Sequence, residues 1–94
     1  MRRLVWSAGF VRAFRRAVRQ QPGLHARAEH AIQRLCEDPF QPSLHAHKLK
    51  GDLSGVWACT VDYDNRILFE FVRDAQSGEE EIHLLTMGTH AEVY

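Results

Sequence analysis

The hydrophobic positions in the first half of the chain recur with the period of a helix. Phe10, Phe14 and Val18 are four residues apart, and Ser7 precedes them at a position where serine commonly caps a helix N-terminus. The Gln-Pro-Gly run that follows separates this pattern from a second helical one. The predicted elements are a short strand over residues 3–6, a helix over residues 7–20, and a helix that starts at Leu24 and stops before Pro39.

The second half of the chain changes to the alternating pattern of strands. Ile67, Phe69 and Phe71 stand at alternate positions, so they should lie on one face of a strand. The predicted loop covers residues 39–46, and predicted turns lie between Gly51 and Gly55, at Asp64-Asn65 and over residues 74–78. The predicted strands cover residues 56–62, 66–73 and 81–87, with a further strand beginning at 47–49 and a short tail at the end.

Together these elements predict a single α+β domain over residues 1–94, in the order βααβββ. The late strands are joined by short links, which cannot form parallel crossovers, so we expect a small, mainly antiparallel sheet. The two N-terminal helices can pack on one face of that sheet. A chain of 94 residues has room for one modest core.

The composition indicates where the protein is located in the cell but not which activity it has. Hydrophobic residues make up 45% of the chain and charged residues 26%, which is typical of a soluble protein. No apolar run approaches the roughly 20 residues that span a bilayer, and no apolar segment follows the basic N-terminus as in a secretory signal. We therefore expect a cytoplasmic protein without a membrane partner. Cys36 and Cys59 lack zinc-site spacing and are expected to be buried thiols.

The net charge of zero hides a strong asymmetry along the chain. Residues 1–50 carry ten Lys and Arg against three acidic residues, a net of +7. Residues 51–94 carry two Arg against nine acidic residues, a net of −7. Because the charge is polarised in this way, the protein can present one basic face to a nucleic acid although its overall charge is neutral.

Four motifs in the right order resemble the RelE/ParE toxin superfamily. Residues 4–7 (LVWS) are similar to the opening strand of its YoeB-like branch, and residues 47–57 (HKLKGDLSGVW) to a strand signature of the YoeB-like and YafQ-like branches. Residues 65–69 (NRILF) resemble the strand that follows. Residues 88–94 (GTHAEVY) closely resemble the C-terminal signature of YafQ-like toxins. The resemblance covers nearly the whole chain and is weakest over residues 20–46.

The resemblance implies a RelE-like fold and a toxin that cuts messenger RNA, in many members on the ribosome. Such toxins inhibit translation and are held inactive by a cognate antitoxin protein, and no cofactor is implied. His47, Asp64 and His90 match site residues of YafQ-like toxins, and Tyr94 matches an aromatic residue. Arg66 matches the phosphate-contacting arginine of the YoeB-like branch, which has a catalytic glutamate where this chain has His47.

Two departures leave the base-stacking and proton-transfer roles open. Thr60 and Asn65 stand where YafQ-like toxins have a histidine and a tryptophan. This leaves three hypotheses: an RNA-cutting toxin, a ParE-like inhibitor of DNA gyrase without catalysis, or an inactive toxin-like module that only binds an antitoxin.

Metal-free RNA cleavage needs three groups, and the matched residues can supply them. One group takes the proton of the 2′-hydroxyl, a second protonates the leaving 5′-oxygen, and a cation stabilises the phosphorane. Histidine suits proton transfer because its unperturbed pKa is about 6.5, and arginine can bind phosphate in bidentate fashion. We assign His47 as base and His90 as acid, with the order interchangeable. Asp64 could orient an imidazole or contact RNA, and Tyr94 could stack on a base or donate a proton.

Other residues are candidates for contacts with RNA. Lys48 and Lys50 lie close to His47 and could bind phosphates. Arg12 and Arg16 belong to a helical stripe that could bind ribosomal RNA or an acidic antitoxin segment, or could simply be a solvated face.

Structural roles compete with these functional ones. Arg66 could pair with Asp62 or Asp64 in a surface ion pair of little energetic value. His45 and His47 alternate as metal ligands can, but no third ligand accompanies them, so no metal is expected. Trp6 and Trp57 fit packing roles better than stacking on RNA.

Overall fold

The computed structural model describes residues 2–51 and 55–94 and contains the predicted sequence of strand, two helices and late strands. Its elements are β1 (Arg3–Trp6), α1 (Ala8–Gln20), α2 (Leu24–Glu37), the 3-10 helix η1 (Pro42–Leu44), β2 (His47–Lys48), β3 (Trp57–Thr60), β4 (Asn65–Arg73), β5 (Glu80–Thr89) and α3 (His90–Val93). The order βαα followed by late strands confirms the predicted α+β class.

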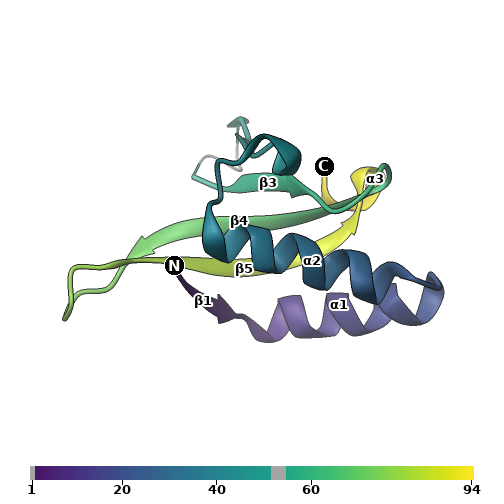
Figure 1. The fold of residues 1–94 in the computed structure, drawn as a ribbon, viewed down its shortest axis with the longest axis horizontal. Coiled ribbons are helices and arrows are strands. Elements are labelled where there is room, and N and C mark those ends of the chain that lie inside the picture. The colour runs from purple at the N-terminus through teal and green to yellow at the C-terminus, as the bar shows by residue number, and fades with distance from the viewer. Residues whose placement is uncertain (1, 52–54) are drawn as a thin grey trace.

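One five-stranded sheet holds all the strands, in the order β1-β5-β4-β3-β2. β2, β3, β4 and β5 pair antiparallel with their neighbours, as their short links predict. β1 instead pairs parallel with β5, with Arg3 opposite Glu81 and Trp6 opposite Leu84. The first and last strands therefore lie side by side, and the two helices form the connection between β1 and the rest of the sheet (Figure 1).

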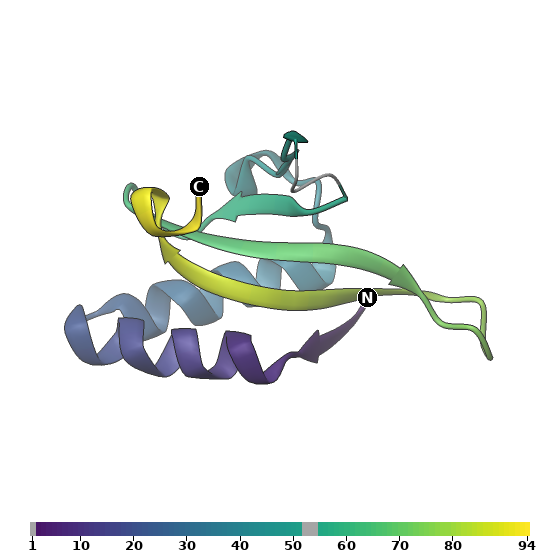
Figure 2. The same ribbon diagram turned by 180° about the vertical axis from the view of Figure 1, so that it is seen from behind.

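The helices leave one face of the sheet open. α2 crosses in front of the sheet in Figure 1 and behind it in Figure 2, while α1 runs along β5 at the lower edge. Hydrophobic residues from both helices and from three strands meet in one core, whose fully buried members include Phe10, Leu24, Leu35, Leu44, Cys59, Ile67, Phe69, Ile82 and Leu84. The alternation of Ile67 and Phe69 thus faces the helices, as predicted.

Local chemistry explains where the two long helices begin. The Ser7 hydroxyl accepts a hydrogen bond from the Phe10 amide (3.0 Å) and donates one to the Leu85 carbonyl (3.2 Å), so it caps α1 and ties it to β5. Gly23 precedes α2 with φ of +82°, a conformation that glycine adopts without strain.

The structure differs from the sequence-based expectations in four places. The loop over residues 39–46 contains η1, and the expected tail after β5 begins with α3. Asn65 is the first residue of β4 and is buried, rather than part of an exposed turn. Cys59 is buried as expected, but Cys36 is only partly so. The expected turn between Gly51 and Gly55 spans residues outside the described ranges. No described helix is long and apolar enough to cross a membrane.

Candidate active site

The register of β3 and β4 turns Arg66 toward the open face of the sheet. Cys59 and Ile67 are opposite each other and are fully buried in the core under the helices. Successive residues of a strand point to opposite faces, so the next pair, Thr60 and Arg66, must face away from the helices. On its other side Arg66 is opposite Gly88 of β5.

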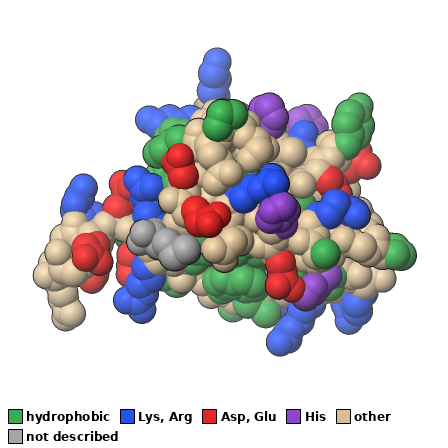
Figure 3. Space-filling view, in the orientation of Figure 1, with side chains coloured by type: hydrophobic (Ala, Val, Ile, Leu, Met, Phe, Trp, Pro, Cys, Tyr) green, Lys and Arg blue, Asp and Glu red, His purple; other side chains and the backbone are tan. Residues whose placement is uncertain are grey.

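A hollow of about 420 Å³ lies around Arg66 and collects side chains from both halves of the chain. Its lining residues are His45, His47, Thr60, Asp62, Tyr63, Arg66, His90 and Tyr94. In Figure 3, histidine side chains appear next to one another at the upper edge of the molecule. The hollow brings together four of the predicted site residues, since His47, Arg66, His90 and Tyr94 all line it.

The Arg66 guanidinium is held by backbone carbonyls. Its Nη1 donates to the carbonyl oxygens of Asp62 (2.8 Å), Tyr63 (3.1 Å) and Asn65 (3.0 Å). Within the described ranges it makes no ion pair, and the Asp62 carboxylate pairs with Arg27 of α2 instead, at 2.9 Å. Neutral carbonyls fix the direction of the guanidinium without cancelling its charge, so the positive charge of Arg66 is available to an anion in the hollow.

The hydrogen bonds of His47 determine which of its ring nitrogens carries the proton. Nδ1 lies 3.0 Å from the backbone oxygen of His45, which can only accept, so Nδ1 must be protonated. In the neutral ring Nε2 then carries the lone pair. The Tyr94 hydroxyl lies 3.4 Å from this Nε2, which is long for a hydrogen bond. His47 thus presents a basic nitrogen to the hollow, and the Tyr94 hydroxyl contacts this nitrogen only weakly.

His90 and Tyr94 are positioned by the short helix α3. Thr89 and Glu92 form a capping box: the Glu92 carboxylate accepts from the Thr89 amide (2.8 Å) and the Thr89 hydroxyl from the Glu92 amide (3.3 Å). The His90 amide donates to the Asp64 carbonyl at 2.8 Å. One helical turn places the rings of His90 and Tyr94 edge to face, with centroids 4.3 Å apart.

Tyr94 keeps its proton at neutral pH. Partial burial raises the pKa of its phenol above the ordinary value, and this outweighs the opposing effect of the nearby Arg66 charge. The protonated hydroxyl is a donor to His47 Nε2, and the ring is edge-to-face with both histidines, with centroids 6.3 Å from His47 and 4.3 Å from His90.

The Asp62 side chain braces the turn that leads to Arg66. From the sequence, Asp62 was expected only as a possible ion-pair partner of Arg66. Asp62 Oδ1 accepts from the backbone amides of Asp64 (3.1 Å) and Asn65 (2.8 Å), and Oδ2 accepts from Arg27. Burial alone would raise the pKa of Asp62, but the hydrogen bond from Asn65 Nδ2 (2.9 Å) and the bonds above more than offset it, so the pKa lies below its ordinary value. The charged carboxylate fixes the turn next to the hollow.

The other residues that the sequence predicted near His47 and Arg66 do not line this hollow. Asp64 is exposed and is not a lining residue; its backbone, through the bond to the His90 amide, is what contacts the site. Lys48 is exposed on β2 and lies over the Trp57 ring at 5.6 Å. Lys50 is exposed just beyond β2. Four lining residues, His45, Thr60, Asp62 and Tyr63, were not predicted as site residues, and only their proximity in the chain to His47 and Arg66 could have indicated them.

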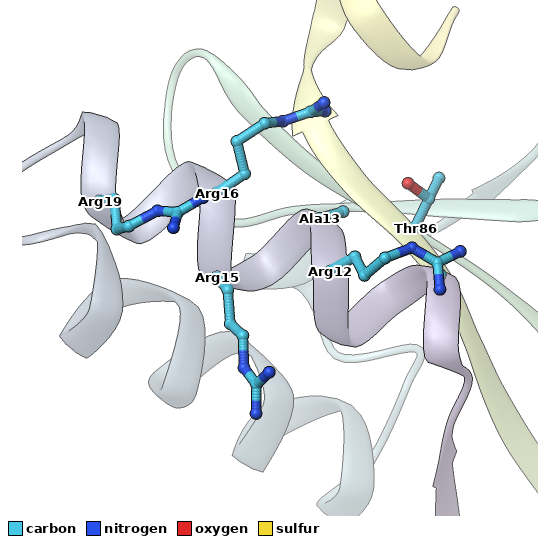
Figure 4. Close-up of a pocket in the computed structure, with 7 residues that line it drawn as sticks. Arg12, Ala13, Arg15, Arg16, Arg19 and Thr86 are labelled. Carbon is cyan, nitrogen blue, oxygen red and sulfur yellow. The ribbon is translucent and has the colours of Figure 1, made fainter.

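Arg12 and Arg16 line a second hollow, of about 580 Å³, between α1 and β5. Figure 4 shows Arg12 extending toward Thr86 of β5 and Arg16 extending toward the end of β5, while Arg15 points away from both. Figure 3 shows basic side chains projecting along the lower edge, where α1 runs. The Arg16 charge also lowers the pKa of Glu92 in α3, after the larger effect of its hydrogen bonds with Thr89. This second hollow, called the arginine hollow below, therefore extends toward α3, the helix that carries His90.

The described residues contain no group of three or more His, Cys, Asp or Glu side chains that could hold a metal ion. His45 and His47 both line the hollow around Arg66, but His47 Nδ1 is hydrogen-bonded to the backbone carbonyl of His45.

Comparison with solved structures identifies the class of fold. No model of a protein family and no curated protein matches the sequence. The structure is similar to those of bacterial toxins, and it has the RelE-like toxin fold that the sequence motifs predicted. YafQ from E. coli strain BL21(DE3) superposes with a TM-score of 0.79 at 14% identity, over 100% of this chain and 99% of that one.

Two further structures extend the comparison. A YoeB/ParE toxin from Agrobacterium tumefaciens has a TM-score of 0.73 at 18% identity, over 94% of this chain and 98% of that one. The E. coli DinJ-YafQ complex contains a chain with a TM-score of 0.77 at 16% identity, over 100% of this chain and 99% of that one. The likeness at this level of identity concerns the fold.

Proposed function

We propose that this protein is the toxin of a toxin–antitoxin pair and acts as a metal-independent endoribonuclease that cuts messenger RNA and so inhibits translation. The observation that carries the proposal is the meeting of His47, Arg66 and His90 in one open hollow. Two groups that can transfer protons thus line the same hollow as a fixed positive charge, which is the set of groups that RNA cleavage through the 2′-hydroxyl requires.

The hydrogen bond of His47 Nδ1 supports His47 as the base, which leaves the role of acid to His90. His47 Nε2 carries a lone pair, so it can take the proton of the 2′-hydroxyl while the 2′-oxygen forms a bond to phosphorus. The bond from phosphorus to the 5′-oxygen breaks, and protonated His90 gives its proton to that oxygen. Arg66 binds the non-bridging oxygens, on which negative charge builds up. The products are a 2′,3′-cyclic phosphate and a 5′-hydroxyl.

The 3.4 Å contact of Tyr94 with His47 fits a gating role before substrate binds. The RNA hydroxyl must replace the Tyr94 hydroxyl at Nε2, and a long hydrogen bond is displaced at little cost. Tyr94 also packs edge to face on His90, which restricts the ring that must protonate the leaving group.

The arginine hollow supports binding of the RNA beyond the reacting phosphate. Arg12 and Arg16 form no ion pair within the described ranges, so their charges are available to phosphates. Lys48 and Lys50 are exposed and close to His47 in the chain, which makes them further candidates for phosphate contacts. We also propose an antitoxin partner, because a similar chain occurs in the DinJ-YafQ complex.

Cleavage of a short single-stranded RNA by the purified protein in EDTA tests the proposal. We expect products with 2′,3′-cyclic phosphate ends, and no cleavage where a 2′-deoxynucleotide replaces the nucleotide that supplies the hydroxyl. His47→Ala and His90→Ala should each lower kcat by about 10²–10⁴-fold, the usual contribution of a positioned proton transfer. His30→Ala removes an exposed histidine of α2 and should leave cleavage unchanged.

A different result would favour another function. If the wild-type protein left RNA and ribosome-bound messenger intact but stopped DNA gyrase from supercoiling, a non-catalytic gyrase inhibitor would replace the proposal. If the protein bound an antitoxin and affected neither target, it would be an inactive binding module.

A further inference from the structure

Tyr63 differs from every other exposed aromatic residue in the described ranges. It is 92% exposed, against 54% for Phe40 and 44% for Tyr94. Phe40 and Tyr94 each pack against other rings, Phe40 with Trp57 and Tyr94 with His90. No described ring packs against Tyr63. Exposing a whole tyrosine ring costs hydrophobic free energy, and a ring partner from outside the chain would recover it.

The backbone that carries Tyr63 is held firmly, although its ring is exposed. The carbonyls of Asp62 and Tyr63 both accept from Arg66 Nη1. Across the turn, the Asp62 carboxylate accepts from the two amides that follow Tyr63, and Arg27 of α2 holds the same carboxylate. The backbone at Tyr63 is therefore already ordered, and only the two side-chain torsions of the ring lose freedom when a flat ligand stacks on it.

Tyr63 also lies beside the group that binds phosphate in the proposed reaction. It lines the same hollow as His47 and His90, and the Arg66 guanidinium contacts its carbonyl at 3.1 Å. A phosphate on Arg66 would place an adjoining nucleotide next to the Tyr63 ring. The position is thus suited to a base rather than to another phosphate.

We infer that Tyr63 is the stacking platform for an unpaired base next to the scissile phosphate, which makes single-stranded RNA the substrate class. The inference rests on the proposed function. A base in a duplex has both faces covered by its neighbours, so only an unpaired base can be turned onto the ring. Every base has a π face, so Tyr63 contributes affinity for single strands with little preference for sequence.

Kinetics on short oligoribonucleotides test the stacking role. Tyr63→Ala should raise KM by about 5- to 150-fold, as expected for a stacking interaction of about 1–3 kcal/mol per base, with a smaller effect on kcat. Tyr63→Phe keeps the ring and should cleave like the wild type. Thermal unfolding of both variants should match the wild type, because the ring makes few contacts within the chain.

An abasic substrate separates stacking from other roles of the residue. Removing the base next to the scissile phosphate should weaken wild-type cleavage to the level of Tyr63→Ala and should not weaken Tyr63→Ala further. Independent effects of the two changes would overturn the inference. So would an unchanged KM in Tyr63→Ala, or a loss in Tyr63→Phe as large as in Tyr63→Ala.

Binding of an RNA blocked by a 2′-deoxynucleotide at the cleavage position distinguishes this inference from the proposed function. If the wild type binds this strand but cleaves no RNA, the nuclease proposal fails; a lower affinity of Tyr63→Ala would then still support stacking. If cleavage occurs and Tyr63→Ala binds like the wild type, stacking alone fails. If the wild type neither binds nor cleaves single-stranded RNA, both fail.

Discussion

The side-chain amides of Gln21 and Asn65 hydrogen-bond to each other in both directions, although 44 residues separate them in the chain. Asn65 Nδ2 donates to Gln21 Oε1 at 3.0 Å, and Gln21 Nε2 donates to Asn65 Oδ1 at 3.2 Å. Gln21 is the C-cap residue that follows α1, and Asn65 directly precedes Arg66 on β4. The amide pair therefore connects the N-terminal helices to the turn beside the candidate site.

Asn65→Ala should destabilise the protein by about 1–3 kcal/mol, since it removes a buried amide and leaves the Gln21 side-chain amide without its partner. Asn65 is 1% exposed. Urea denaturation of Asn65→Ala, Gln21→Ala and the double variant measures the coupling. The double variant should be destabilised by less than the sum of the two single effects. Full additivity would contradict a direct interaction between the amides.

Asp62 should make the protein less stable in acid. Its pKa is lower in the folded than in the unfolded state, so its carboxylate stabilises the fold above the unfolded pKa. This contribution is lost as the pH falls through the folded pKa. Urea midpoints between pH 6 and pH 2 should fall more steeply for the wild type than for Asp62→Asn. Glu37→Gln, which removes an exposed carboxylate at the end of α2, should follow the wild type.

Gly88→Ala should lower cleavage through α3. A Cβ at this position would lie 3.0 Å from Glu92 Oε1 and 3.2 Å from Val93 Cγ1, so the capping box must shift. These neighbours need to move by a few tenths of an ångström, so the loss in kcat should be smaller than the roughly 10²-fold that a misplacement of about 1 Å can cause. Rates on single-stranded RNA measure the effect. Gly78→Ala introduces strain at φ of +73°, in the hairpin at the far end of the sheet, and should lower stability without changing kcat.

The two cysteines should differ in reactivity. Burial raises the pKa of the Cys59 thiol to about 12, although a hydrogen bond with Ile67 and the Arg66 charge oppose it. Its thiolate fraction at pH 8 is therefore negligible, whereas Cys36 is only partly buried. A disulfide reagent at pH 8 should modify Cys36 first in native protein and both thiols in urea. Because the Cys59 thiol ionises less readily when folded, its contribution to stability is present below pH 9 and is lost as the pH rises toward 12.

Arg12 and Arg16 should govern how RNA binding depends on salt. Removing one arginine–phosphate interaction should make the slope of log affinity against log salt concentration shallower by about 0.7 for a single strand. Arg12→Gln and Arg16→Gln should thus weaken binding most at low salt. Arg34→Gln on α2 is a control of equal charge. Equal slopes for all three variants would exclude the arginine hollow from the RNA path.

Local periodicity was enough to predict most of the fold. Phe10, Phe14 and Val18 mark one face of α1, and Ser7 caps it as expected, because these features depend on residues only a few positions apart. The short links between late strands similarly required antiparallel pairing. The parallel pairing of β1 with β5 was not predictable in this way, since it joins residues that are far apart in the chain, such as Arg3 and Glu81.

Sequence motifs also indicated His47, Arg66, His90 and Tyr94 as candidates, each within its own segment. Only the tertiary structure decided that these four line one hollow, because strand register and the start of α3 set where each side chain points. The structure likewise showed that Asn65 is buried and hydrogen-bonded to Gln21, whereas the sequence showed only that it replaces the tryptophan of YafQ-like toxins. The structure also added Tyr63 to the residues that line the hollow. Each candidate residue can be recognised within its own segment of the sequence. Hydrogen bonds between distant segments determine which of these side chains come together in the fold.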